Sequence, residues 1–255
     1  MGIGMNGFLT LLYKELLRFW KVGFQTLFAP MLSTLLYLLI FSHVLEERAQ
    51  VYPSVTYTVF LIPGLVIMAM LQNAFANSSS SLIQSTVSGN HIFMLLSPLS
   101  YQEIFTAYVL ASVVRGLIVG LGIYVVAVSF FELPLYSFAW VMVFALMGTA
   151  LLGGLGIIAG IWAEKFEHLA ALQNFAIVPL TFLSGVFYTI SSLPSFWRGL
   201  SYLNPFFYMV DGFRYGFFHS SEVSPYLSLG ILMVCFLAVS WWTLRMLKTG
   251  YKIRK

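Results

Sequence analysis

The sequence predicts an all-α integral membrane protein, and three observations carry this prediction. Of the 255 residues, 60% are hydrophobic and only 9% are charged, whereas about 25% of a typical soluble protein is charged. So few charges cannot cover a soluble surface of this size without leaving large apolar patches. Six apolar stretches are long enough to cross a hydrocarbon core of about 30 Å as helices. These stretches lack the alternation of apolar and polar residues that is typical of a membrane β-barrel.

The six predicted spans take up just over half of the chain and leave no room for a separate soluble domain. We therefore expect a single transmembrane domain over 1–255. The predicted spans are 26–45, 57–76, 104–130, 137–162, 172–190 and 226–247. The single cysteine, Cys235, excludes an intrachain disulfide and a cysteine-based metal cluster. We expect no bound metal and no nucleic-acid partner.

The distribution of Lys and Arg predicts the orientation, because short loops rich in these residues stay in the cytoplasm. With six spans and both termini inside, nine cations are cytoplasmic and three are outside. The cytoplasmic set is Lys14, Arg18, Lys21, Lys165, Arg245, Lys248, Lys252, Arg254 and Lys255, and the outer set is Arg48, Arg198 and Arg214. A cleaved signal peptide is not expected, since no positive charge precedes residue 14.

Residues 6–22 carry too many charges to span, and helical periodicity separates a basic side from an apolar side. Lys14, Arg18 and Lys21 group together with Glu15 beside them. Two interpretations remain open. The segment is either an amphipathic helix at the membrane interface, with its cations facing lipid headgroups, or a helix packed on its own protein. Gly23 separates it from the first span.

The region 77–103, between the second and third spans, is predicted to be a long, Ser-rich cytoplasmic loop that is partly apolar. The stretch from His91 to Leu99 predicts a short helix ended by Pro98. Exposed apolar turns on this side need a partner. The short helix either docks on a separate soluble protein or lies on the lipid surface.

The segment 191–220, after the fifth span, has ten aromatic residues among thirty. Ser192 and the pair Asn204-Pro205 are candidate helix starts, because Asn caps a helix and Pro is tolerated in its first turn. We expect short helices at the outer interface, where Trp and Tyr are favoured in any membrane protein. Asp211 and Arg214 are spaced to pair across one helical turn.

Two blocks of sequence carry a resemblance to a known family. They are LLSPLSYQEIFTAYVLASVVRG before and within the third span, and LSGVFYTISSLPSFWRGLSYLNPFFYMVDGFRYGFF before the sixth. The chain resembles, over essentially its whole length, the bacterial permeases of the ABC type-2 transporter family. The resemblance implies six membrane helices, an N-terminal amphipathic helix, a cytoplasmic coupling helix between helices 2 and 3, and short re-entrant outer helices between helices 5 and 6.

The resemblance also implies roles for particular residues. The family's ATPase contact falls on the coupling region 77–103, and the outer gate falls in the second block. We interpret the short loop before the fifth span as a second ATPase contact. The coupling residues are Asn90, His91, Leu95, Leu96, Ser97, Pro98, Glu164 and Glu167, and the outer-gate residues are Trp197, Asn204, Pro205, Tyr208 and Arg214. Glu164, Glu167 and His168 lie close enough in sequence to suggest a metal site, but a solvated turn explains them more simply.

The sequence also indicates where the energy for transport comes from. An ion-coupled carrier usually places a carboxylate inside the membrane, and none of the six predicted spans contains Asp or Glu. A phosphate-binding loop needs a Gly-Lys pair, which the chain lacks. The chain also has no His-Glu-x-x-His motif, and its Leu183-Ser184-Gly185 lacks the glycine that a hydrolase elbow needs. We therefore expect no enzyme activity and no cofactor in this chain, with ATP and Mg²⁺ bound by a separate ATPase.

Arg115 is the only charged residue deep in a predicted span, where it costs about 2.5–3.5 kcal/mol at the helix centre. It either lines a pathway or binds an anionic headgroup, or it pairs structurally with carbonyls or amides. The pathway candidates are Gln72, Asn73, Arg115, Gln173 and Asn174. Pro63 and Pro179 interrupt the second and fifth spans, which favours those spans as pathway walls. The Gly116–Gly120 and Gly156–Gly160 pairs predict close helix packing.

Together these observations predict the transmembrane permease subunit of an ATP-driven exporter in the bacterial inner membrane. Its expected partners are an ABC ATPase, a second copy of itself and membrane lipids, and its expected substrate is amphipathic, lipid-linked or drug-like. The first, second and fifth helices of two subunits would enclose the route, as the resemblance implies. The alternative is a passive channel or scaffold, which would act without ATP.

Overall fold

The computed structural model describes residues 2–45, 55–90 and 98–251, and every regular element in them is a helix. The long helices are α1 (Gly2–Lys21), α2 (Gly23–Leu45), α3 (Tyr57–Val87), α5 (Tyr101–Val128), α6 (Phe138–Trp162) and α11 (Pro225–Thr249). The short ones are α7 (Phe166–Leu172), the π-helix η1 (Gln173–Ile177), α8 (Val178–Phe182), the 3₁₀-helix η2 (Ile190–Ser192), α9 (Ser195–Tyr202) and α10 (Pro205–Phe218).

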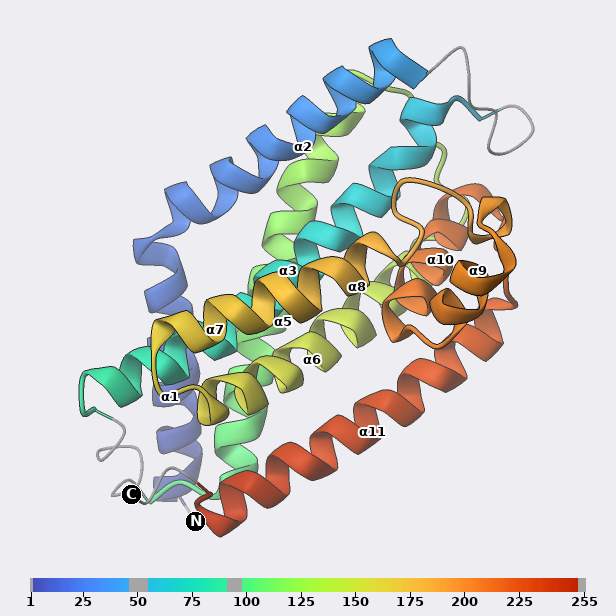
Figure 1. The fold of residues 1–255 in the computed structure, drawn as a ribbon. Coiled ribbons are helices and arrows are strands. Elements are labelled where there is room, and N and C mark those ends of the chain that lie inside the picture. Colours follow the sequence, from blue (N-terminus) through green and yellow to red (C-terminus); the bar gives the residue numbers. More distant parts are fainter. Residues whose placement is uncertain (1, 46–54, 91–97, 252–255) are drawn as a thin grey trace.

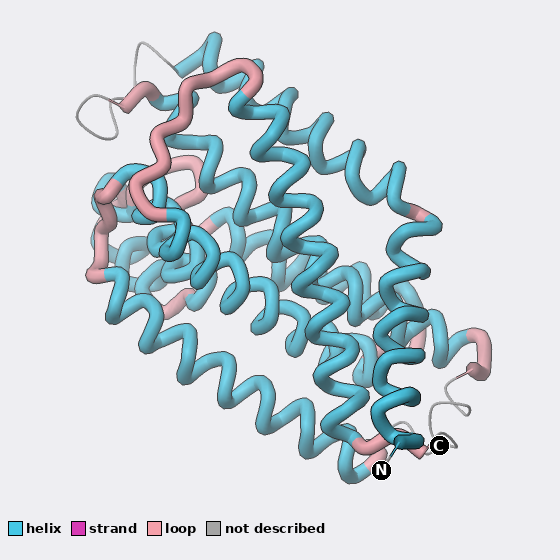
Figure 2. The backbone as a smooth tube through the Cα atoms, turned by 180° about the vertical axis from the view of Figure 1, so that it is seen from behind, coloured by secondary structure: helices cyan, strands magenta, loops and turns pink. Residues whose placement is uncertain are grey.

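The long helices form a bundle around α3 (Figures 1 and 2). In the most apolar stretch of α3, 78% of the residues are buried, against 17% in α2 and 22% in α11. Helix α3 packs on α6, α5, α10 and α2, whereas α2 and α11 lie at the periphery. The start of α1 and the end of α11 lie at the same end of the bundle, here called the terminal end. The helices α9 and α10 lie toward the opposite end, here called the far end.

Five described helices are long and apolar enough to cross a membrane: α2, α3, α5, α6 and α11. They lie on the predicted spans 26–45, 57–76, 104–130, 137–162 and 226–247, although α3 continues well beyond residue 76 to Val87. The predicted fifth span, 172–190, is wrong as a single helix. The structure instead has a helical segment over 166–182, composed of α7, η1 and α8, followed by a turn in which Gly185 has φ +79°.

Pro179 explains why this segment contains a π-helix. Proline has no N–H with which to continue an α-helical ladder. The helical turn before Pro179 contains one extra residue, so that the N–H of Val178 bonds to the carbonyl of Gln173, five residues back. The helix ends at Phe182, where the Tyr188 hydroxyl donates to the carbonyl of Phe182 at 3.0 Å. This early end explains why the segment is too short for a full-length span.

The Ser-rich stretch 77–87 is helical, so its prediction as a loop is wrong. Helix α3 continues to Val87, and Asn77, Ser78, Ser79 and Ser81 are buried along it. The hydroxyl of Ser79 donates to the carbonyl of Phe75 at 2.7 Å, one turn back. Such bonds satisfy a serine within its own helix, so the serines do not need water. The predicted short helix over 91–97 lies outside the described residues.

Glycines bring α6 into close contact with α3, which confirms the packing interpretation of the Gly156–Gly160 pair. A Cβ atom at Gly156 would collide with the side chain of Ser78 and the carbonyl of Phe75. One at Gly160 would lie 2.7 Å from Cβ of Leu82. The hydroxyl of Ser78 in turn donates to the carbonyl of Gly153 at 2.7 Å. Small residues on α6 therefore allow the polar half of α3 to pack closely against α6.

Helix α1 bends into α2 at Val22, next to Gly23 as expected (Figure 1). One face of α1 packs on the protein through Leu11, Glu15 and Phe19, while Tyr13 and Trp20 are 63% and 70% exposed. The structure therefore shows this helix packed on its own protein through one face, and its contact with the membrane interface stays a prediction. The charged residue Glu15 lies on the packed face.

We predict that Gly156→Ala destabilises the bundle by about 1–3 kcal/mol, because the added methyl group overpacks the α3–α6 contact. The matched control is Gly230→Ala on α11, where nothing lies within 4 Å of an added Cβ. The control should be neutral or stabilising by up to about 1 kcal/mol, since alanine favours helix. Thermal unfolding in detergent measures both variants, and equal midpoints would contradict the packing described for Gly156.

Candidate functional site

A groove of about 330 Å³ lies between α2 and α3 and contains two of the predicted pathway residues, Gln72 and Asn73. Its walls are Ala29, Pro30, Ser33, Thr34, Tyr37, Leu65, Met68, Ala69, Gln72 and Asn73. Four of its polar side chains, Ser33, Thr34, Tyr37 and Gln72, have no hydrogen-bond partner among the described residues. Because α2 is mostly exposed and apolar, this groove is a polar strip on an otherwise apolar face.

Arg115 lies beside this groove, near the middle of α5. Its Nη2 donates to Oδ1 of Asn73 at 3.1 Å, and its guanidinium lies 5.8 Å from the ring centre of Phe19 on α1. The amide nitrogen of Asn73 donates to the carbonyl of Ala69 at 3.0 Å, which turns its oxygen toward Arg115. Nε of Arg115 is buried without a partner. Arg115 is thus held by neutral groups.

The structure does not bring Gln173 and Asn174 to Arg115. They lie on η1, where Gln173 is half-buried and Asn174 is exposed, and neither side chain has a hydrogen-bond partner within the described ranges. The neighbouring Phe175 is 85% exposed. A second, largely apolar groove of about 780 Å³ runs along this segment to α9. Its walls are Phe175, Ala176, Pro179, Leu180, Phe182, Leu183, Phe187, Tyr188, Trp197 and Leu200.

A buried charged cluster joins α1 to α3 on the terminal side of the groove, and the sequence did not predict it. Glu15 is fully buried and accepts from the hydroxyl of Ser81 at 2.8 Å. Arg18 Nε lies 3.3 Å from Glu15 Oε2, and Arg18 Nη2 donates to the carbonyl of Asn77 at 2.6 Å. The spacing of Glu15 and Arg18, three residues apart in a helix, was the available signal. The exposed Lys14 also lies 3.2 Å from Glu15.

The predicted coupling residues divide into described and undescribed positions. Asn90 and Pro98 are exposed, and they flank the undescribed segment that contains His91, Leu95, Leu96 and Ser97. Glu164 is exposed on the connection from α6 to α7, and Glu167 is exposed in the first turn of α7. Figure 1 shows this connection at the terminal end, as it also shows the end of α3. No group of three metal-ligating side chains is present in the described part of the chain.

Most of the predicted outer-gate residues belong to a closed network of hydrogen bonds at the far end. Asn204 caps α10 by accepting from the N–H of Phe206, and its amide donates to the carbonyl of Leu180 at 2.6 Å. Pro205 opens that helix, so the predicted start is confirmed. The other predicted start, at Ser192, is wrong: α9 begins at Ser195, because Pro194 holds an extended conformation. Trp197 is half-exposed on the apolar groove.

Asp211 and Arg214 each bind backbone groups. The two carboxylate oxygens of Asp211 accept from the N–H groups of Glu222 and Val223 at 2.9 and 3.2 Å. Burial raises the pKa of Asp211 above its usual range, although these hydrogen bonds oppose the shift. Arg214 donates to the carbonyls of Gly185 and Val186 at 3.1 and 3.2 Å.

Further contacts tie this network to the bundle. The guanidinium of Arg214 lies 3.8 Å from the ring centre of Phe60 on α3. The hydroxyl of Tyr57 donates to the carbonyl of Phe187 at 2.7 Å, and that of Tyr208 donates to the carbonyl of Tyr202 at the same distance. Glu222 accepts from the N–H groups of Ile190 and Ser191 at 2.6 and 2.8 Å. The far end is therefore a rigid cap anchored on α3.

Comparison with known proteins identifies the family. A family model described as ABC-2 type transporter matches residues 6–218, which include both grooves, the charged cluster and the helices α9 and α10 of the far end. The chain belongs to the ABC-2 type transporter family. It is 38% identical over 227 residues to proteins named inner membrane transport permease YadH from Escherichia coli K12 and from Shigella flexneri, and the match covers 88% of each chain. The ABC-2 match ends before α11.

We predict that replacing Glu15 alone lowers the stability of this ABC-2 chain more than replacing Glu15 and Arg18 together. Glu15→Met leaves Arg18, whose side chain is 23% exposed, without its carboxylate. Breaking a fully buried pair typically costs about 3–5 kcal/mol, and the cost here is smaller because solvent screens the partly exposed Arg18. The double variant Glu15→Met/Arg18→Met should recover part of that loss, since replacing both ions with apolar groups is often close to neutral. Unfolding of the purified variants in detergent measures the difference. Glu132→Met at an exposed position is the control and should change little. A double variant no more stable than Glu15→Met would contradict this description.

We also predict that the α2–α3 groove is wet in the membrane. In a Cys235→Ala background, cysteines at Ser33 or Gln72 should react with a charged, membrane-impermeant maleimide, because unpartnered polar groups favour water. A cysteine at Leu32 is the control: it lies next to Ser33 on α2, and the native side chain is 60% exposed on an apolar surface. Equal labelling at positions 32, 33 and 72 would contradict a polar route along this groove.

Proposed function

We propose that this chain is the permease subunit of an ATP-driven exporter in the bacterial inner membrane and works as a dimer with a separate ATPase. The observation that carries the proposal is the polar groove between α2 and α3 in a member of the ABC-2 type transporter family. The names of the YadH relatives support the permease role and the inner-membrane location. Both termini are then cytoplasmic, at the end of the bundle that carries most of the Lys and Arg residues.

The distribution of exposed surface supports a dimer. Helix α2 exposes Phe24, Leu32 and Leu39 by 60–76%, and the α7–η1–α8 segment exposes Phe175. The groove with its unpartnered polar groups lies between α2 and α3. Groups of this kind are costly in lipid but are satisfied in a water-filled route. A second copy facing α2, α3 and α7–η1–α8 would enclose such a route from the two grooves.

The two grooves together fit an amphipathic cargo. The α2–α3 groove offers hydroxyl and amide groups with Arg115 beside it, and the groove along α7–α8 offers aromatic and aliphatic surface. One cargo that contacts both would need a polar part and an apolar part. We therefore propose an amphipathic, lipid-linked or drug-like substrate. The helices α9 and α10 are proposed as re-entrant outer helices that form the gate.

ATP coupling is tested by co-purification from the native host in mild detergent. The tagged chain should bring down a protein that hydrolyses ATP. Leu95→Glu and the pair Glu164→Lys/Glu167→Lys should reduce the recovered ATPase activity several-fold, because they place charges of the wrong kind at the proposed contacts. The matched control is Phe130→Glu, in the turn after α5, where a 71% exposed phenylalanine receives the same change away from the terminal end.

Two results would count against the proposal. The first is recovery of no ATP-hydrolysing partner, with the chain itself folded and abundant. The second is equal loss of the partner in the Leu95→Glu and Phe130→Glu variants. A passive channel or scaffold predicts that labelling of a cysteine at Gln72 is unaffected by ATP. The exporter predicts that ATP, added to the complex, changes that labelling.

A further inference from the structure

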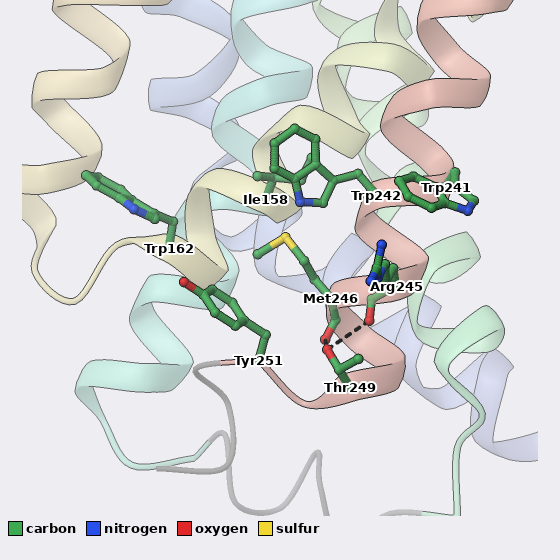
Figure 3. A pocket seen from close by; sticks show the side chains of 8 residues that line it. All are labelled: Ile158, Trp162, Trp241, Trp242, Arg245, Met246, Thr249 and Tyr251. Atoms are coloured by element: carbon green, nitrogen blue, oxygen red, sulfur yellow. Dashed lines mark hydrogen bonds between the residues drawn. The ribbon is translucent and has the colours of Figure 1, made fainter.

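A cavity of about 520 Å³ lies between α6 and α11 near the terminal end, away from both grooves described above. Figure 3 shows its walls, with Trp242 and Ile158 above, Met246 in the middle, Trp162 on one side and Tyr251 below. The full lining is Ile158, Trp162, Trp241, Trp242, Arg245, Met246, Thr249 and Tyr251. Both helices are membrane-span candidates, so the cavity faces the region that lipid occupies.

Four side chains that line this cavity carry hydrogen-bond donors without an acceptor among the described residues. Arg245 has its guanidinium 5.4 Å from the ring centre of Trp241, and no carboxylate lies among the lining residues. Within the described ranges, the side chains of Trp241, Trp242, Arg245 and Tyr251 have no hydrogen-bond partner. The hydroxyl of Thr249 is already bonded to the carbonyl of Arg245 at 2.9 Å. A site with a cation and surplus donors fits an anion.

Its position along the helices limits the source of that anion. Trp162 is the last residue of α6, and Arg245 and Thr249 occupy the last turns of α11. Trp and Tyr favour the depth of the lipid headgroups. Lys248 lies on the following turn, 5.9 Å from the ring centre of Tyr101 on α5, and adds a second cation at this depth. Toward the membrane centre, α11 exposes Val234 and Leu237 by 67% and 59%.

We propose that this cavity binds an anionic phospholipid of the surrounding leaflet. The phosphodiester contacts the guanidinium of Arg245, with the indole N–H groups of Trp241 and Trp242 and the Tyr251 hydroxyl as further donors. An acyl chain runs along Ile158, Met246 and Trp242 toward the exposed apolar side of α11. Basic pockets between membrane helices recognise anionic headgroups in this way. The site is independent of the proposed transport function, because it shares no residue with either groove.

Native mass spectrometry of the purified full-length chain tests the proposal, with phosphatidylglycerol and phosphatidylcholine of identical acyl chains as probes. The wild-type chain should bind phosphatidylglycerol about tenfold more tightly than phosphatidylcholine. Arg245→Gln should bring the two affinities to within about twofold of each other. Millimolar inorganic phosphate should not displace the bound lipid, because phosphate lacks the acyl chain that the apolar wall holds.

Lys165→Gln is the matched control, since Lys165 is an exposed cation at the same end of the molecule. It should leave the preference for phosphatidylglycerol unchanged. Equal effects of Arg245→Gln and Lys165→Gln would show unspecific charge attraction and overturn the proposal, as would equal affinity of the wild-type chain for both lipids. Trp242→Phe, which keeps the apolar ring and removes one N–H donor, should lower phosphatidylglycerol binding less than Arg245→Gln does. Unaltered thermal unfolding of each variant keeps a folding defect from being mistaken for a lost site.

Discussion

The structure depends on one constraint: polar groups that α3 carries into the bundle must find partners inside the protein. Lipid offers no hydrogen bonds, and an unsatisfied polar group there is costly. Ser79 is satisfied by its own helix, Ser78 by the carbonyl of Gly153 on α6, and Ser81 by Glu15 on α1. The same set of bonds fixes which helices surround α3 and how closely they approach. The glycines of α6 then follow as a requirement, because a larger side chain would hold the donors and acceptors apart.

The charged cluster on α1 follows from the same constraint. A carboxylate as buried as Glu15 is stable only when it is paired and hydrogen-bonded, and Arg18, Lys14 and Ser81 meet that need. Arg18 in turn reaches the backbone and side chain of Asn77. An amphipathic helix that only lay at the interface would gain no partner for a glutamate on its inner face. Helix α1 is thus an integral part of the bundle that still presents Tyr13 and Trp20 outward.

The sequence predicts those features that depend on length and local chemistry. Continuous apolar runs predict five of the spans, and Asn204-Pro205 predicts the start of α10, because a cap and a first-turn proline act within a few residues. The Ser-rich end of α3 could not be predicted, because serine residues occur both in polar loops and in buried helices where they are hydrogen-bonded. What decides between them is a partner on α6 or α1, far away in sequence. The early end of the fifth apolar run at Phe182 escapes for a similar reason, since it is stabilised by Asn204, Tyr188 and the turn at Gly185.

Helix α3 also connects the three polar regions of the molecule, which has consequences for any transport cycle. Its last turns bind the α1 cluster, its middle carries Gln72 and Asn73 at the groove, and its first turns hold Tyr57 and Phe60 against the far-end cap. A helix transmits displacement along its axis, but opening a route also needs elements with two arrangements. On the proposed function, two breaks are the candidates for such elements: the bend at Val22 joins α1 to α2, and the π-helix at Gln173–Ile177 joins α7 to α8. The π-helix borders the apolar groove through Phe175 and Ala176, and the bend precedes the helix that lines the polar groove. We therefore propose that α3 and the far-end cap move as one body while the groove walls rearrange around them.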